Sequence, residues 1–284
     1  MRIRARFLVL LAAGLVPAAL LAGQSALDPT AAAIVREGRE RPRAMAHLDF
    51  LCNSIGPRLT GSDGYTEACR WALGLFEAWG LSGCRLEQWG EAPVLFNRGP
   101  WWGRMHWKEG AEERRQGLEF NTPAWSAGTR GVRRGRALMA PGDAQGFERV
   151  REACAGAWLV VPLAGGRGRS GFDLARAALE AGCLGLVGGR RGELLQTGAG
   201  PDGAYSRLAW ERLPRLPRIA LVEADHRRLT ALLAAGTEVE LEFLVENRFR
   251  PGPVALHNVI ADLPGVERPD EFVQIGRASC RERV

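Results

Sequence analysis

The chain has 284 residues and a formal net charge of +6, an excess that is typical of proteins with acidic partners such as nucleic acids. Three of the positive charges are arginines at positions 2, 4 and 6, and residues 277–284 add a net two, so the remainder carries only +1. Lys108 is the single lysine among 38 basic residues, a bias more typical of GC-rich coding than of a binding surface. These numbers argue against a nucleic-acid partner.

The N-terminus has the design of a secretory signal. Arginines precede the apolar run at residues 7–21, and the small residues Ala22 and Gly23 then offer a cleavage site. We therefore expect residues 1–23 to be a signal peptide, the mature chain to begin near Gln24, and the protein to be periplasmic or extracellular. The run is shorter than the roughly 20 residues that a membrane-spanning helix needs, so we expect no stable membrane insertion after cleavage.

Residues 33–51 mix apolar and charged positions and predict a helix. Gly and Pro break regular structure in residues 53–64, and either Ser62 or Asp63 is suited to cap the next helix by accepting backbone N–H bonds. That helix has apolar residues three and four positions apart, which predict one buried face, and Gly80 is placed to end it. The face comprises Ala68, Trp71, Ala72, Leu75, Phe76 and Trp79.

A short extended segment at residues 84–89 leads into residues 91–122, where no period is sustained. This stretch holds Trp101, Trp102 and Trp107, together with His106. Such rings could stack on a ligand or pack as a loop against a core. Aromatic clusters usually supply buried area, so the composition favours a packed loop.

From about residue 128 the pattern changes to short strands that alternate with helices, which predicts a separate α/β module over residues 126–248. Both ends of this module lie within the chain, so we expect it to fold alone. Strands are expected at residues 136–139, 157–162, 183–187, 216–222 and 237–247, and helices at 143–154, 172–181 and 224–235.

The module contains a glycine motif, GxGxxG at residues 166–171, after an apolar strand and before a helix. Glycines in this order let a backbone approach a pyrophosphate at a helix N-terminus, so an NAD(P)-binding oxidoreductase module is one hypothesis. Against it, residues 162–165 separate the strand from the motif, and the helix is expected to start only near Phe172. A surface loop is the favoured interpretation.

The cysteines and histidines predict no structural metal site. No CxxC pair occurs, the histidines are far apart, and buried or loosely paired thiols are favoured over metal ligation. We interpret His257 as a loop residue and His226 as a solvated surface residue, and assign neither to a site. Outside residues 277–284, the cysteines are Cys52, Cys69, Cys84, Cys154 and Cys183.

Two short segments, IGPRLTGS at residues 55–62 and NVIADLPG at residues 258–265, flank the α/β module. Together with the helix that carries Trp71 and with residues 267–273, they resemble exported zinc-dependent metallopeptidases, the family of bacterial aminopeptidases and plasma glutamate carboxypeptidase. The module between them resembles the protease-associated domain that many of these enzymes carry as an insertion.

The resemblance implies an α/β fold, namely an incomplete zinc-exopeptidase domain of the phosphorylase/hydrolase-like α/β/α type, interrupted by the inserted protease-associated domain. It also implies a full-length parent that binds two zinc ions and hydrolyses terminal bonds of a peptide substrate with a metal-activated water. The implied divisions are a signal peptide at 1–23, the N-terminal part of the peptidase domain at 24–125, the protease-associated domain at 126–248 and the start of the catalytic sheet at 249–276.

Family members continue from the strand matching residues 272–276 into a His-x-Asp segment that starts the two-zinc site. Here residues 277–284 stand in its place, and residues 275–284 back-translate into a common sequencing adapter. We therefore expect a non-native tail at 277–284 and an inactive chain that binds no zinc. We assign no catalytic, metal-binding or substrate-binding residue. A non-catalytic binding protein of the protease-associated type is a further hypothesis.

Overall fold

The computed structural model describes residues 28–163, 172–192, 209–271 and 273. The chain divides into two compact units, residues 1–50 and residues 51–284. The expected signal peptide, the glycine motif and the expected tail lie outside the described residues.

The first unit contains two short helices where the sequence predicts one. α1 (Pro29–Glu40) follows Asp28, whose Oδ2 accepts the backbone N–H groups of Thr30 and Ala31 at 3.0 and 3.3 Å. α2 (Ala44–Asp49) begins only after Pro42. Proline has no N–H for a helical hydrogen bond and disfavours helical backbone at the preceding residue, so the expectation of one helix over 33–51 is wrong.

The π-helical turn η2 (Phe50–Ile55) begins at the last residue of the first unit, and the helix α3 (Asp63–Ala78) follows in the second unit. Ser62 is the cap, since its Oγ accepts the backbone N–H of Tyr65 at 3.0 Å. Gly80 follows the helix with a φ of +75°, a left-handed conformation that glycine adopts without strain. The predicted face is only half-buried, and its last member, Trp79, is 51% exposed.

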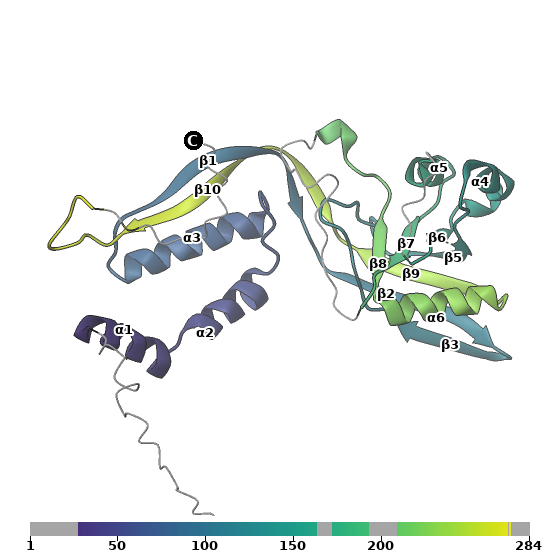
Figure 1. The fold of residues 1–284 in the computed structure, drawn as a ribbon. Coiled ribbons are helices and arrows are strands. Elements are labelled where there is room, and N and C mark those ends of the chain that lie inside the picture. The colour runs from purple at the N-terminus through teal and green to yellow at the C-terminus, as the bar shows by residue number, and fades with distance from the viewer. Residues whose placement is uncertain (1–27, 164–171, 193–208, 272, 274–284) are drawn as a thin grey trace, which may run out of the picture. The chain divides into compact units, whose positions relative to one another are not determined.

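A long antiparallel ribbon packs against α3. It consists of β1 (Ser82–Asn97) and β10 (Arg248–Asp262), which pair from Ser82 opposite Asp262 to Asn97 opposite Arg248. α3 lies along this ribbon, and it contacts both strands (Figure 1). The segment predicted to be extended at 84–89 is thus confirmed as part of a longer strand.

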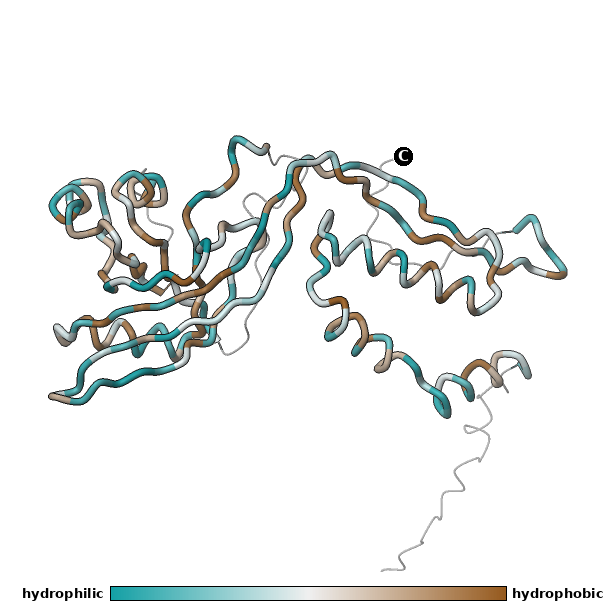
Figure 2. The backbone as a smooth tube through the Cα atoms, turned by 180° about the vertical axis from the view of Figure 1, so that it is seen from behind, coloured by the Kyte–Doolittle hydropathy of each residue, from teal (hydrophilic) through white to brown (hydrophobic). Residues whose placement is uncertain are grey.

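The other strands form one mixed sheet in the order β3-β2-β9-β5-β6-β7-β8-β4. The four central strands, β5 to β8, run parallel, and antiparallel strands flank them on both sides. The edge strand β3 is charged and hydrophilic along its length, which discourages pairing with other chains (Figure 2). The strands are β2 (Trp101–Glu109), β3 (Glu112–Gly117), β4 (Phe120–Asn121), β5 (Arg133–Met139), β6 (Trp158–Val160), β7 (Gly185–Gly189), β8 (Arg218–Leu221) and β9 (Val239–Val245).

Helices cover both faces of this sheet, as the side chains of β6 show. Trp158 and Val160 share a buried cluster with Leu229 of α6, whereas Leu159, which points the other way, packs in a second cluster with helices α4 and α5. This arrangement confirms the α/β prediction for the segment. The helices are α4 (Ala144–Val150), α5 (Leu174–Glu180) and α6 (Glu223–Ala234), with 3-10 turns η3 (Glu152–Cys154) and η6 (Trp210–Arg212). Among the described helices, none has the length and apolar character that crossing a membrane requires.

The tryptophan-rich segment is β-structure, so the expectation of a packed loop over residues 91–122 is wrong. Along β2, Gly103, Met105 and Trp107 are buried and their neighbours are more exposed, which is the period of a strand with one face on a core. β2 pairs with β9, and β4 pairs with β8. The sheet therefore includes residues 101–121, which precede the expected module boundary at residue 126.

Candidate functional site

The described residues provide no ready set of metal ligands. Within the ranges that the structure covers, no three His, Cys, Asp or Glu side chains are grouped closely enough to hold a metal ion. The two-zinc site implied by the resemblance is thus not built from these residues. We derive no catalytic step through zinc from them.

The structure places two histidines differently from the sequence expectation. His257 lies within β10 and is half-buried, not in a loop. His226 is not solvated, since it is 2% exposed and its Nε2 lies 2.8 Å from the carbonyl oxygen of Val161. Its position in the first turns of α6 aims the ring at the sheet, where Gly189 leaves the necessary space.

The first of the two segments that carry the resemblance, together with α3 directly after it, contacts the part of β10 directly before the second segment, although about 200 residues separate them in the sequence. The Tyr65 hydroxyl donates to the carbonyl oxygen of His257, and the Cys69 Sγ lies 3.8 Å from the same oxygen. A Cβ added to Gly61 would lie 3.7 Å from Leu256 Cδ2, so the glycine packs directly on β10. The segments thus form one packed junction between α3 and the ribbon.

This junction is structural in character. Burial raises the pKa of the Tyr65 hydroxyl and of the Cys69 thiol, so both stay protonated near neutral pH. Ser62 is 2% exposed and is occupied with its cap hydrogen bond. These side chains hold the elements together and offer no activated nucleophile.

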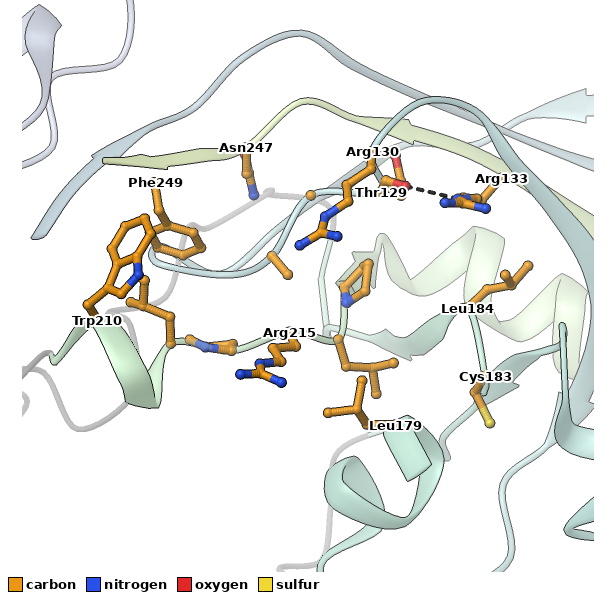
Figure 3. Close-up of a pocket in the computed structure, with 16 residues that line it drawn as sticks. Thr129, Arg130, Arg133, Leu179, Cys183, Leu184, Trp210, Arg215, Asn247 and Phe249 are labelled. Carbon is orange, nitrogen blue, oxygen red and sulfur yellow. Dashed lines mark hydrogen bonds between the residues drawn. The ribbon is translucent and has the colours of Figure 1, made fainter. Parts of the chain in front are cut away.

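A cavity of about 780 Å³ lies beside the mixed sheet (Figure 3). One wall consists of the turn that carries Arg130 and the first residue of β5, Arg133, and another is the segment before β8, which carries Trp210 and Arg215. Arg130 extends from its turn towards the segment that carries Arg215 (Figure 3). The remaining walls are largely apolar, with Leu179, Leu184, Leu213, Pro214, Leu216, Pro217 and Phe249.

Hydrogen bonds to the end of β9 fix the arginine-bearing turn. The backbone N–H of Thr129 donates to the carbonyl of Val245 at 2.9 Å, and the Thr129 Oγ1 accepts the Val245 N–H at 2.9 Å. Asn247 supports the same loop, since its Nδ2 donates to Ser126 and to Thr122. The turn is completed by Arg130 and Gly131, whose φ angles are +53° and +95°.

The cavity is positively charged. Its lining among the described residues includes three arginines and no Asp or Glu. No ion pair found between described residues involves Arg130, Arg133 or Arg215. A concave, partly apolar surface whose guanidinium groups pair with no carboxylate among the described residues suits an anionic group that is attached to an apolar body.

Sequence reasoning missed this cavity because its arginines are dispersed. Arg133 and Arg215 are 82 positions apart, and the chain is rich in arginine throughout. Only the fold distinguishes these arginines from the rest.

The glycine motif at 166–171 lies outside the described residues, and α5 begins at Leu174 after the cap Asp173, so the helix starts beyond the motif as expected.

No protein-family model matches the chain. No curated protein matches it either. Among solved structures, the chain is similar to a Peptidase M28 precursor from Shewanella amazonensis, with 19% identity, a TM-score of 0.47, and coverage of 84% of this chain and 54% of that one.

Two further solved structures, both of aminopeptidases, are also similar to the chain. An aminopeptidase from Aneurinibacillus sp. strain AM-1 has 16% identity and a TM-score of 0.40 over 78% of this chain and 48% of its own. A zinc aminopeptidase from Bacillus subtilis has 14% identity and a TM-score of 0.42 over 79% and 47%. The chain thus spans about half the length of these proteins, and likenesses with TM-scores below 0.5 do not assign it to a family.

Proposed function

We propose that this chain is part of an exported zinc-dependent exopeptidase and that its α/β sheet is an accessory module of the protease-associated type. The observation that carries the proposal is the packed junction between residues 55–62 and β10. The two segments that resemble the peptidase family are distant in sequence, yet the hydroxyl of Tyr65, just after the first, donates to the carbonyl of His257, just before the second. Such a contact is expected if both segments belong to one peptidase domain.

In this proposal the metal ligands belong to the longer parent, in the segment that follows Gly276 there in place of residues 277–284. Hydrolysis by a metalloexopeptidase needs carboxylate and imidazole ligands for the metals and a carboxylate that accepts a proton from the attacking water. The proposed role of the described residues is to carry the accessory module and the ribbon at the edge of the catalytic domain.

The test compares the 284-residue chain with the gene product read from genomic DNA through the codons that follow Gly276. We expect the longer product to continue into a His-x-Asp segment and to hydrolyse terminal peptide bonds in a reaction that a zinc chelator abolishes. Aminoacyl nitroanilides and N-blocked dipeptides separate aminopeptidase from carboxypeptidase activity. The 284-residue chain should show less than about one thousandth of that rate, because a missing catalytic group typically costs several orders of magnitude.

Two results would contradict the proposal. One is a genomic stop codon directly after Val284, which would remove the longer product. The other is hydrolysis that is unaffected by chelation, which would assign a different chemistry to the enzyme.

A second candidate function, binding of an anionic peptide end by a non-catalytic module, is supported by the basic cavity. We expect a peptide with a free C-terminal carboxylate to bind at least about tenfold more tightly than its amidated form, since one charge-assisted hydrogen bond contributes about 1.5–3 kcal/mol. Calorimetric titration measures the dissociation constants of both peptides. The double substitution Arg130→Gln and Arg215→Gln should remove the difference.

The matched control is Arg218→Gln. Arg218 is also exposed and lies on β8, but it does not line the cavity. Equal binding of the free and amidated peptides, or equal losses in the control and in the double variant, would exclude this cavity as the carboxylate site.

A further inference from the structure

Two cysteines that are distant in sequence lie together in the mixed sheet. Cys154 ends the η3 turn just before β6, and Cys183 follows α5 just before β7. β6 and β7 are parallel neighbours, with Trp158 opposite Gly185. Each cysteine therefore stands at the N-terminal end of one of two adjacent strands.

Backbone hydrogen bonds hold these two strand ends side by side. The N–H of Gly156 donates to the carbonyl of Gly182 at 2.9 Å, and the N–H of Leu184 donates to the carbonyl of Ala157 at 2.8 Å. Both cysteines belong to the cluster on the face of the sheet that α4 and α5 cover. Both thiols are free, and each lies close enough to affect the pKa of the other.

The other described cysteines have different surroundings. The Cys69 Sγ lies 3.8 Å from the His257 carbonyl oxygen, and the Cys84 Sγ lies 3.3 Å from that of Leu81. Cys52 is exposed. Within the described ranges, Cys154 and Cys183 are thus the two cysteines that adjacent strand ends and one buried cluster bring together.

We propose that Cys154 and Cys183 form a structural disulfide when the chain folds in an oxidising compartment. The biological setting rests on the proposed export, because disulfides persist in exported proteins and are rare in the cytosol. A disulfide needs Cα atoms about 4.4–6.8 Å apart, which is close to the spacing of about 4.8 Å between neighbouring strands. The crosslink would close a loop that contains α5 and β6.

The oxidant is a donor disulfide, either a small molecule such as oxidised glutathione or the disulfide of an oxidoreductase. One cysteine thiolate attacks a donor sulfur, forms a mixed disulfide and releases the first donor thiol. The second cysteine thiolate attacks the protein sulfur of that mixed disulfide and displaces the second donor thiol. The protein loses two hydrogens and two electrons, and the donor disulfide gains them.

Burial decides when this exchange is fast. Cys154 is 0% exposed, and Cys183 is 8% exposed at the wall of the basic cavity (Figure 3). Burial, with the neighbouring Cys154, raises the pKa of the Cys183 thiol to about 12, and the attacking species is the thiolate. Oxidation should therefore be rapid while the chain folds and slow once the cluster has closed.

The direct test is a peptide map. The full 284-residue chain is refolded with reduced and oxidised glutathione, alkylated in denaturant and digested with trypsin without reduction. We expect residues 152–167 and 177–190 as one linked species, lighter by two hydrogens than the sum of the separate peptides, and the other cysteines alkylated. Recovery of both peptides in alkylated form, or linked to other cysteines, would overturn the proposal.

Thermal unfolding is the second measurement. Reduction should lower the melting temperature of the refolded protein by about 10 °C, as expected for a crosslink that closes a loop of this length. The double substitution Cys154→Ala and Cys183→Ala should abolish the response to reductant, and the control Cys69→Ala should keep it. An unchanged response in the double variant would refute the assignment.

Refolding in vitro keeps this test independent of the proposed export. A protein that forms the linked peptides with glutathione but stays in the cytoplasm of its host would refute export and leave the disulfide assignment intact.

Discussion

Gly103 shows how a single absent side chain shapes the mixed sheet. A Cβ built on this residue would lie 2.4 Å from Phe243 Cδ1 and 2.9 Å from Phe120 Cε1, within overlap distance of both rings. Those rings meet edge to face with centroids 5.1 Å apart, and Phe243 is fully buried. The strand β2 can lie against this aromatic pair because Gly103 has no side chain.

We therefore expect Gly103→Ala to destabilise the protein by about 2–3 kcal/mol, because extra atoms in a packed core force strain. Urea unfolding measures the change. The control is Gly117→Ala on the neighbouring strand β3, where an added Cβ meets nothing within 4 Å, and its effect should stay within about 0.5 kcal/mol. Equal effects of the two substitutions would contradict the aromatic contact.

The raised pKa values of Cys154 and Cys183 lead to a second prediction, which concerns the stability of the reduced protein. Burial raises the pKa of both thiols, that of Cys183 to about 12 from a usual value of 9.0. Between these values the unfolded chain loses the proton while the folded chain keeps it, so stability is complete below about pH 9 and falls as pH rises towards 12. The urea midpoint of the reduced protein should decline over this window.

The control for this pH dependence is the variant that lacks both thiols, Cys154→Ala and Cys183→Ala. Its midpoint should decline less steeply, because tyrosine and other alkaline groups titrate equally in both proteins. Identical pH profiles would show that the buried thiols contribute nothing to the alkaline loss of stability.

Among the elements, α3 depends on its first turn. Ser62 caps it by accepting the Tyr65 N–H at 3.0 Å, and this places the Tyr65 hydroxyl on the carbonyl oxygen of His257. The cap thus positions the helix against the ribbon as well as satisfying one backbone group.

Ser62→Ala should therefore destabilise the helix by about 1 kcal/mol, which corresponds to about fivefold faster hydrogen exchange at the Tyr65 amide. Exchange measured by mass spectrometry or NMR tests this. Ser82→Ala is the control, since Ser82 is exposed and its Oγ donates only to the Asp262 carbonyl at 3.0 Å. Unchanged exchange at Tyr65 would mean that the cap is dispensable.

At the scale of the whole molecule, the contacts of residues 98–121 indicate where the α/β module begins. Arg98 donates to the Thr122 Oγ1 and carbonyl at 2.9 Å each, and β2 and β4 pair with strands of the segment 126–248. Burial lowers the pKa of Arg98. These contacts favour a module that starts near residue 98.

We accordingly expect a fragment of residues 98–248 to unfold cooperatively and a fragment of residues 126–248 to be unstable or to aggregate. The shorter fragment leaves β9 without its neighbour β2 and exposes the face that carries Leu241 and Phe243. Circular dichroism with urea distinguishes the two. Equal stability of both fragments would restore the boundary at residue 126.

The sequence by itself determined the local elements of the α/β segment. The alternation in residues 237–247, the apolar run at 157–162 and the helix that ends at Gly80 are local patterns, because period and turn residues act within a few positions. The sequence pattern was misleading at two places. Pro42 divides residues 33–51 into two helices, and tryptophans on both faces of β2 obscure the strand alternation within residues 91–122.

Only the tertiary structure decided which distant residues meet. It brought Tyr65 to His257, Cys154 to Cys183, and Arg130 and Arg133 to the cavity that also contains Arg215. It also buried His226, which the sequence pattern assigned to the surface. The physical reason is that strand order and helix docking depend on the packing of the whole sheet, which no short stretch of sequence encodes.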